Sequence, residues 1–286
     1  MTYDPTPIDE AYAWCRRITH EHGANFSVGF RFLPLAKRDA VYAAYAFCRW
    51  ADDIADDAGE GIGARLDAWE EELERCYSGS AGHRISIALA DALQRFAIPK
   101  SAFAALIAGC RQDIVKNRYQ TFEELVDYCD LVATSISDIS LAIFGYRGDD
   151  TPAIGRNLST ALQLTNITRD IGDDLDRNRI YLPLAELDRF GVSEEELARR
   201  SETRGVRRLI EFQIERAESY FAAAEPLLQR LDTDARYPTL LMGSVYATVL
   251  RKVAKDPFAA LHRRVALTRS EKLRVVASRL IHRHFL

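Results

Sequence analysis

The 286-residue sequence predicts an all-α fold in one domain. Apolar residues recur at helical spacing in long amphipathic runs, and no run alternates apolar and polar residues as a half-buried strand would. The breaks between the runs are short and contain the residues that end helices. No Pro- or Ser-rich linker and no fixed-period repeat divides the chain, so we expect residues 1–286 to form a single helical domain.

Seven amphipathic runs account for most of the expected helices. Each keeps apolar residues three and four positions apart, which places them on one helical face. In chain order the runs are 8–22, 35–56, 64–77, 85–96, 122–144, 152–175 and 205–231. Helices are expected to end where glycine, serine or proline interrupts the pattern, because these residues weaken or break helical hydrogen bonding. Those places are 59–63, 78–80, Pro99, 145–150, Pro183 and Pro238.

The composition is that of a packed globular protein, with 48% hydrophobic and 28% charged residues. No stretch approaches the roughly 18–20 apolar residues that a membrane helix needs, and residues 1–21 lack the basic start and apolar run of a signal peptide. We therefore expect a cytoplasmic protein. The cysteines are odd in number and form no CxxC pair, which argues against a disulfide framework and a zinc site. We expect small buried side chains at Cys15, Cys48, Cys76, Cys110 and Cys129.

Charge is distributed unevenly along the chain. The formal net charge of −4 gives no reason to expect nucleic acid as a partner. Residues 251–286, however, carry ten Lys and Arg against two acidic residues. A solvated helical face is the ordinary interpretation of such a segment, and contact with anionic phosphates or with an anionic membrane surface is the alternative.

An acidic stripe follows one face of the run 35–56. Tyr45, Arg49, Asp52 and Asp56 stand at i, i+4, i+7 and i+11, which is a single line on a helix of 3.6 residues per turn. The residues around this line are largely apolar, including Trp50. An ordinary solvent-facing surface would spread its charges more broadly, so the stripe is expected to line a cleft.

A second stripe of the same kind follows the run 152–175. Gln163, Asn166, Asp170 and Asp174 stand at i, i+3, i+7 and i+11 among leucine and isoleucine residues. Polar atoms placed on an apolar helix cost desolvation free energy, which suggests a functional reason for them.

Paired carboxylates one helical turn apart repel each other, and a hard cation would relieve that repulsion. Magnesium prefers a few carboxylates together with water and phosphate oxygens, which two facing DxxxD stripes could supply. No His or Cys accompanies the stripes as a ligand set, so no transition metal is indicated. One DxxxD pair alone is usually a surface charge pair, but two pairs with Arg49 and Asn166 in register favour a magnesium site.

These residues resemble the squalene and phytoene synthase family, whose members have the all-α isoprenoid synthase fold with a central cavity. The segment YAFCRWADDIAD is similar to the first aspartate motif of that family, and QLTNITRDIGDDLDRNRIYLP is similar to the second. Weaker similarities extend from Asn25-Phe26 to Lys272-Leu273.

The resemblance implies roles for individual residues of this chain. Magnesium would be bound by Asp52, Asp56, Asn166, Asp170 and Asp174. The diphosphates would be bound by His22, Tyr45, Arg49, Asn166, Arg179, Tyr246 and Arg264. Catalysis would depend on Tyr128, placed near the reacting carbons, together with Arg49, Asp52 and Asp170. Where the family has a VAGxVG segment, this chain has Thr134 and Ser137 in place of the two glycines, and the adjacent Asp138 adds a charge near the expected tunnel.

The resemblance implies head-to-head condensation of two farnesyl or geranylgeranyl diphosphates through a cyclopropylcarbinyl diphosphate. The ADDIADD form slightly favours a squalene-pathway enzyme, with phytoene synthase as the alternative and a non-catalytic relative as a further one. NADPH is a candidate cofactor that no motif indicates. A head-to-tail prenyltransferase or terpene cyclase would typically lack the RNRIYLP continuation. Because the substrate is strongly hydrophobic, we also consider peripheral membrane contact through the basic C-terminal region.

Overall fold

The computed structural model describes residues 7–23, 27–57, 60–279 and 284–286. Within these ranges the chain is helical, and its only β-type pairings are two isolated bridges, between Arg118 and Ile180 and between Tyr146 and Leu231. This confirms the all-α prediction. None of the described helices is long and apolar enough to cross a membrane.

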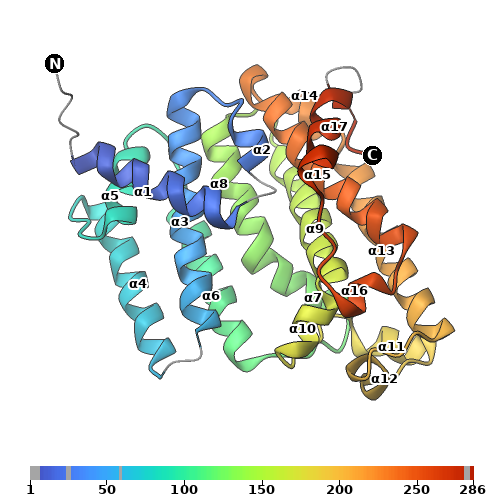
Figure 1. Ribbon diagram of the computed structural model, residues 1–286. Coiled ribbons are helices and arrows are strands. Elements are labelled where there is room, and N and C mark those ends of the chain that lie inside the picture. The colour runs from blue at the N-terminus through green and yellow to red at the C-terminus, as the bar shows by residue number, and fades with distance from the viewer. Residues whose placement is uncertain (1–6, 24–26, 58–59, 280–283) are drawn as a thin grey trace.

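The helices form one bundle in which three layers can be followed from left to right in Figure 1. In chain order they are α1 (Pro7–His22), α2 (Ser27–Phe30), α3 (Leu35–Asp56), α4 (Ile62–Ser78), α5 (Arg84–Leu93), α6 (Lys100–Val115), α7 (Phe122–Cys129), the π-helical turn η1 (Asp130–Thr134), α8 (Ser135–Phe144), α9 (Thr151–Arg169), α10 (Ile171–Asp176), α11 (Leu184–Phe190), α12 (Glu194–Ala198), α13 (Arg204–Ala224), α14 (Leu227–Arg230), α15 (Thr233–Lys255), α16 (Ala259–His262) and α17 (Arg269–Arg279).

The layers place α3 and α9 on opposite sides of the molecule's interior. On one side α1, α4 and α5 pack against α3, and on the other α13 and α15 pack against α9. Between them lie α6, η1 and α8, which contact one another. Aromatic packing joins α3 to α4, because the rings of Phe47 and Trp69 stack with their centroids 4.5 Å apart. Helices α3 and α9 are the two that carry the acidic stripes.

The structure corrects several expected helix boundaries. The run 205–231 divides into α13 and α14 at Glu225 and Pro226, and the run 85–96 stops being helical after Leu93. The run 152–175 is not one helix, because the chain leaves regular helical geometry at Asp170, with φ −104° and ψ 14°. Asp170 accepts a hydrogen bond from Nε of the adjacent Arg169 at 2.7 Å, and adjacent residues on a regular helix do not face each other. Pro238 does not end a helix either, since it lies inside α15. It stands in the second turn, where it removes only one backbone hydrogen bond.

The expectation for the cysteines is confirmed in its main part. All five are buried and unpaired. Cys110 is more than a small apolar side chain, however, because its Sγ lies 3.3 Å from Oδ1 of Asp52 and donates to it. The pair Asn25-Phe26, which resembles the family sequence, lies outside the described residues. Residue 59 of the expected helix break at 59–63 also lies outside them.

Candidate active site

A cavity of about 810 Å³ lies between α3 and α9. Helices α1, α6, α7, α8, α14 and α15, the turn η1 and the segments that follow α10 and α16 also contribute to its walls. Every residue for which the sequence predicts a site role lines this cavity: His22, Tyr45, Arg49, Asp52, Asp56, Tyr128, Asn166, Asp170, Asp174, Arg179, Tyr246 and Arg264. The cavity therefore brings together side chains that lie more than 200 positions apart in the sequence.

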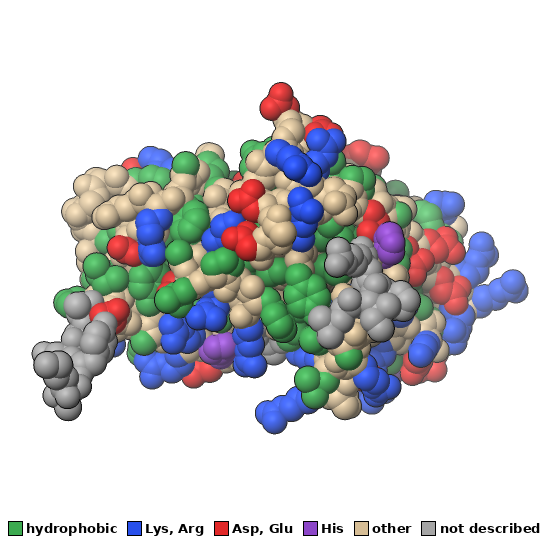
Figure 2. All heavy atoms as spheres, turned by 90° about the horizontal axis from the view of Figure 1, so that it is seen from above, with side chains coloured by type: hydrophobic (Ala, Val, Ile, Leu, Met, Phe, Trp, Pro, Cys, Tyr) green, Lys and Arg blue, Asp and Glu red, His purple; other side chains and the backbone are tan. Residues whose placement is uncertain are grey.

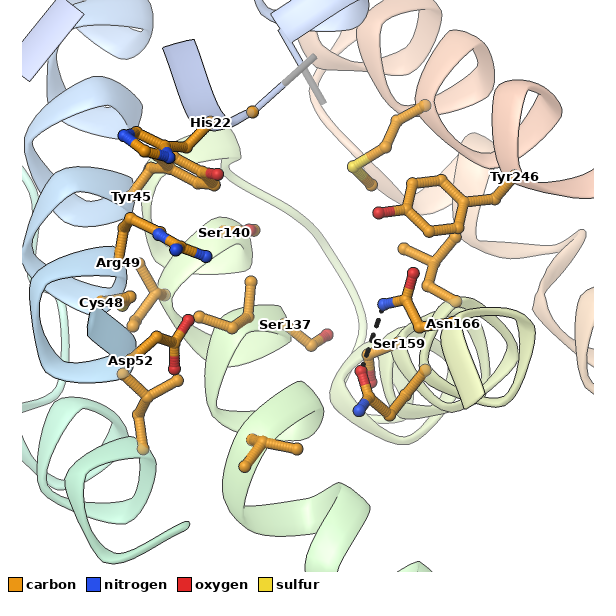
Figure 3. A pocket seen from close by; sticks show the side chains of 18 of the residues that line it. His22, Tyr45, Cys48, Arg49, Asp52, Ser137, Ser140, Ser159, Asn166 and Tyr246 are labelled. Carbon is orange, nitrogen blue, oxygen red and sulfur yellow. Dashed lines mark hydrogen bonds between the residues drawn. The ribbon is translucent and has the colours of Figure 1, made fainter. Parts of the chain in front are cut away.

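The two acidic stripes face each other across the cavity. In Figure 3, Tyr45, Arg49 and Asp52 project from α3 on one side, while Asn166 and Tyr246 project from the other side. Asp56 lies one turn beyond Asp52 at the end of α3. The carboxylates thus collect at one end of the cavity, toward the C-termini of both α3 and α9.

The Asp52 carboxylate is held in an environment that disfavours its charge. Burial raises its pKa to about 6, and the charges of Asp56 and Asp113 add to this effect. The Cys110 thiol and the Arg49 guanidinium partly oppose the rise. Arg49 itself forms an ion pair with Asp53, one turn further along α3. Asp52 therefore carries a negative charge near pH 7 that its protein neighbours only partly balance.

The second stripe shows the same excess of negative charge. Burial raises the pKa of Asp174 to about 7, with the nearby Asp170 charge as the next cause. Asp170 is better compensated, because it pairs with the buried Arg169 and also with Arg264, whose Nε lies 3.2 Å from its Oδ1. Despite the helix break, the amide of Asp174 donates to the carbonyl of Asp170 at 2.9 Å, so the two residues keep the separation of one helical turn.

Two arginines of the RNRIYLP segment close the polar end of the cavity. Arg179 donates to Oδ1 of Asp56 at 3.1 Å, and Arg177 donates to Oδ2 of the same carboxylate at 3.3 Å. The segment that follows the second stripe is thereby tied to the first stripe. The sequence assigned Arg179 to diphosphate binding, and the structure places it in the cavity wall as a partner of Asp56.

Oxygen atoms suited to a hard cation are present on both walls. The side-chain Oδ1 of Asn166 is buried and has no hydrogen-bond partner, while its Nδ2 donates to Gln163 at 3.3 Å. A buried acceptor without a partner is costly, and a cation would satisfy it. Among the described residues, no group of three or more His, Cys, Asp or Glu side chains is arranged to hold a metal ion by itself. The donor set fits magnesium, which keeps water and phosphate oxygens among its ligands.

The remaining predicted diphosphate ligands surround the same space. The Tyr45 and Tyr246 side chains extend toward each other from opposite sides in Figure 3, with His22 beside Tyr45. Tyr246 is 2% exposed, and it receives a hydrogen bond from Arg169. Burial raises the pKa of Tyr246 to about 12, so it remains a neutral hydrogen-bonding group at physiological pH.

Three residues in or beside the cavity are functional candidates to which the sequence assigned no site role. Arg169 is 4% exposed and links Asp170 to Tyr246. Asp113 and Tyr181 line the cavity beside Tyr128, and both tyrosine hydroxyls donate to the Asp113 carboxylate. Arg169 could have been recognised from the sequence, because a charged residue among the leucines and isoleucines of the second stripe is unusual unless it has a buried partner. The contacts of Asp113 depend on how separate helices pack, and no local pattern reveals them.

The opposite end of the cavity is largely apolar. Its lining includes the side chains Val41, Leu106, Val132, Ile136, Leu141, Phe144, Leu158, Leu162, Leu227 and Leu231. Ser137, one of the two departures from the expected glycines, lies in this wall, where an added Cβ on Gly155 would lie 2.8 Å from its hydroxyl. Thr134 donates instead to Asp130 at 2.8 Å. Asp138 was expected near the tunnel, but it is not among the residues that line it.

Comparisons with known proteins agree with this geometry. The squalene/phytoene synthase family model matches residues 19–271. A 15-cis-phytoene synthase of Synechocystis sp. (strain ATCC 27184 / PCC 6803 / Kazusa) is 35% identical over 280 residues, which cover 93% of this chain and 83% of that protein. The phytoene synthase of Arthrospira platensis is 34% identical over 288 residues, covering 94% and 92% of the two chains.

Solved structures give the same result. The squalene synthase HpnC from Alicyclobacillus acidocaldarius is 33% identical and superposes with a TM-score of 0.83, covering 89% of this chain and 97% of that one. A dehydrosqualene synthase in complex with ligand is 27% identical with a TM-score of 0.89, covering 96% and 97%. The family match includes both acidic stripes and the arginines that join them. The chain therefore belongs to the squalene/phytoene synthase family of prenyltransferases.

Proposed function

We propose that this prenyltransferase joins two identical allylic prenyl diphosphates head to head and forms a cyclopropylcarbinyl diphosphate. The observation that carries the proposal is the arrangement of the cavity. Two acidic stripes with flanking arginines face each other at its polar end, and an apolar compartment adjoins them. Such a cavity suits two molecules with an anionic head and a long apolar tail.

We propose geranylgeranyl diphosphate as the substrate. The sequence slightly favoured the squalene pathway, but curated relatives at 34–35% identity over more than 90% of this chain are named phytoene synthases and support the alternative better. On α3, the lining residues run from Val41 to Asp56. At 1.5 Å per residue this is roughly 22 Å of helix, which leaves room for a long tail behind the polar end.

We propose that Mg²⁺ is bound between the stripes by Asp52, Asp56, Asn166, Asp170 and Asp174, together with substrate oxygens. Bound there, the cation would neutralise charge on the diphosphate leaving group. The raised pKa values of Asp52 and Asp174 and the unsatisfied Asn166 Oδ1 support this assignment.

The chain's own residues would act on both halves of the substrate. Arg49 and Arg264 lie where the diphosphate would bind and can donate charge-assisted hydrogen bonds to it as its C1–oxygen bond breaks. The apolar walls exclude water from the allylic cation that remains. Tyr128, 4% exposed in the cavity wall, is the proposed group for removing a proton after the second double bond has attacked.

The direct test is product identification. Purified protein is incubated with Mg²⁺ and either farnesyl or geranylgeranyl diphosphate, and extracted products are identified by mass spectrometry. The expected product is the C40 cyclopropylcarbinyl diphosphate or a C40 hydrocarbon. A longer linear diphosphate, or no consumption of either substrate by folded protein, would refute head-to-head condensation.

A squalene-type reaction is the second candidate, favoured by the 33% identity and TM-score of 0.83 to a squalene synthase. In the same assay it predicts consumption of farnesyl diphosphate and C30 products. A parallel arm with NADPH decides whether the second half of that reaction ends in reduction. A C30 product that forms only with NADPH would establish the cofactor.

We also propose that one face of the protein docks on an anionic membrane surface. Helix α2, the start of α3 and α17 lie at the upper end of the molecule in Figure 1, and Figure 2 shows hydrophobic side chains gathered beside Lys and Arg on that face. Exposed apolar residues there include Phe32 at 49% and Leu273 at 69%. The Phe32 ring contacts Tyr237, and the Tyr237 hydroxyl donates to the carbonyl of Val276 on α17. Phe32 and Leu273, which is also on α17, therefore belong to one surface.

Not all of the basic residues in 251–286 are available for this contact. Lys252 pairs with Glu271, Arg264 pairs with Asp170, and Arg279 is 8% exposed. Arg269 and Arg274 are exposed on α17. Arg283 lies outside the described residues.

The membrane proposal is tested by co-sedimentation with vesicles of phosphatidylglycerol or phosphatidylcholine. Each basic residue near an anionic surface contributes about 1 kcal/mol, so the double variant Arg269→Glu/Arg274→Glu should bind about 30-fold more weakly or worse. A matched control makes the same charge change at the opposite end of the molecule, with Arg199→Glu/Lys255→Glu. Equal binding to both lipids, or equal loss in both variants, would refute the assignment of this face.

A further inference from the structure

Asp113 is an acidic residue at the polar end of the cavity that lies outside both acidic stripes. It stands on α6, and its two carboxylate oxygens each accept a hydrogen bond from a different tyrosine. Tyr128 donates to Oδ2 at 2.8 Å, and Tyr181 donates to Oδ1 at 2.9 Å. The carboxylate therefore joins α6, α7 and the segment after α10 at a single point.

Ring packing fixes the orientation of these two hydroxyls. The Tyr128 and Tyr181 rings stack with centroids 5.3 Å apart and an interplanar angle of 27°. Tyr119 packs against both, at 5.4 Å and 5.7 Å. The rings are 0–8% exposed, so neither phenol can swing away from Asp113 without disrupting the packed cluster.

This geometry determines what Tyr128 can do as a base. Burial raises the pKa of Tyr128 well above its ordinary value, so the phenol stays protonated at physiological pH. A neutral phenol accepts a proton efficiently only if its own proton can leave at the same time. The hydrogen bond to Asp113 already points that proton at a carboxylate oxygen.

We propose that Asp113 is the terminal proton acceptor of a Tyr128–Asp113 relay that completes formation of the cyclopropane. The inference rests on the proposed head-to-head function. After the C1–oxygen bond of one substrate breaks with its electron pair leaving on diphosphate, the double bond of the second substrate forms the new carbon–carbon bond and leaves a tertiary cation. A carbon-bound proton then moves to the Tyr128 oxygen while the Tyr128 hydroxyl proton moves to Oδ2 of Asp113. The electron pair of the broken C–H bond closes the three-membered ring.

The surroundings of Asp113 suit this role. Tyr181 holds the other oxygen in place, and Arg179 lies 3.5 Å from the backbone carbonyl of Asp113 while it pairs with Asp56. The titratable and charged groups that face the carboxylate are Tyr119, Tyr128, Tyr181, Cys110, Arg179, Asp52 and Asp56. Arg179 is the one cation among them, and the polar end of the cavity gives the proton a way to solvent after product release.

The relay predicts a change in product partitioning that a purely structural residue would not cause. In Asp113→Asn, ionisation of the first substrate should continue, because the residues that bind the diphosphate are untouched. Proton removal should slow by about 100-fold or more, the usual contribution of a general base. With no base to trap the coupled tertiary cation, its new carbon–carbon bond would reopen and water would capture the regenerated allylic cation. Released diphosphate would then be matched by prenyl alcohol instead of coupled product. The assay measures diphosphate, prenyl alcohol and coupled product in the same reaction.

Two further variants keep the test decisive. Tyr128→Phe breaks the relay and leaves Asp113 in place, so it should shift the product in the same way even if Asp113→Asn fails to fold. Tyr119→Phe is the matched control, because Tyr119 belongs to the same ring cluster but bonds to Gln112. It should keep the wild-type ratio of coupled product to diphosphate. A wild-type ratio in Asp113→Asn or in Tyr128→Phe would overturn the relay. Absence of coupled product from the wild-type enzyme would instead refute the proposed function.

Discussion

Replacing Asp174 with Asn should stabilise the metal-free protein. Burial and the nearby Asp170 raise the Asp174 pKa from 3.8 to about 7. Between those two pH values the folded state holds a proton that the unfolded state has released, so stability falls as pH rises and levels off above pH 7. At 1.36 kcal/mol per pKa unit, the ionised carboxylate costs about 4 kcal/mol at pH 8. Asn has nearly the same shape and no charge to desolvate.

The expected signal is a pH-dependent difference in melting temperature. For 286 residues the unfolding entropy is about 0.6 kcal/mol/K, so 4 kcal/mol corresponds to a Tm about 7 °C higher for Asp174→Asn at pH 8. The same linkage makes the variant's advantage about 2 kcal/mol smaller at pH 5.5, which is about 3 °C. Thermal unfolding followed by circular dichroism in EDTA measures both values.

A control and a metal arm sharpen this test. Asp56 is 32% exposed and is paired with Arg177 and Arg179, so Asp56→Asn should leave Tm unchanged or lower it by up to about 2 °C. Adding Mg²⁺ with inorganic diphosphate at about 100 times the dissociation constant should stabilise the wild type by about 2.7 kcal/mol and Asp174→Asn by much less. If Asp174→Asn melts at or below the wild-type temperature at pH 8, or if its advantage does not depend on pH, the reasoning fails.

The remaining predictions concern activity, substrate length and stability. Asp52→Asn and Asp170→Asn should each lower turnover by at least about 100-fold with an unchanged far-UV circular dichroism spectrum, and near-normal turnover in both would contradict the metal assignment. Ser137→Phe should fill part of the apolar end of the cavity beside Gly155 and shift the preferred substrate from the C20 to the C15 diphosphate. An assay in which the two substrates compete measures this shift. Glu72→Gln should lose about 1–3 kcal/mol by denaturant unfolding at pH 7, because the buried carboxylate accepts from two backbone amides, Ser86 and Arg75. Hydrogen bonds lower the pKa of Glu72, so this deficit should shrink as pH falls below 4.5.

The fold was predictable where helices are strongly amphipathic, and several other helices were missed, α6 and α15 among them. The run 35–56 matches α3 at both ends, because one face of it packs and the other is polar. Helix α15 was overlooked because most of its positions are buried, which removes the polar face that periodicity detects. The internal Pro238 hid it further, since a proline is ordinarily evidence that a helix ends.

The site was predictable to the extent that its residues share a helix. The spacing of Asp52 and Asp56, and of Asp170 and Asp174, reveals each stripe from the sequence, but the facing of the two stripes depends on how α3 and α9 pack. The break at Asp170 was not foreseen, because a regular helical template does not contain the contact between adjacent side chains that is found there. Asp113 is the only acidic residue in α6. Its proposed role becomes visible only in the structure, where tyrosines from two other segments donate hydrogen bonds to it.

The arginines of this site already have partners before any substrate arrives, and this constrains how binding can occur. Asp170 is paired with Arg169 and Arg264, and Asp56 is paired with Arg177 and Arg179. Under the proposed function, magnesium would take over the carboxylates while the diphosphates took over the arginines. Such an exchange replaces each ion pair with another of the same kind, so it costs less than exposing unpaired charges in a partly buried cavity. The arginines would therefore hold the acidic walls together in the free enzyme and become ligands for the leaving group once the metal binds.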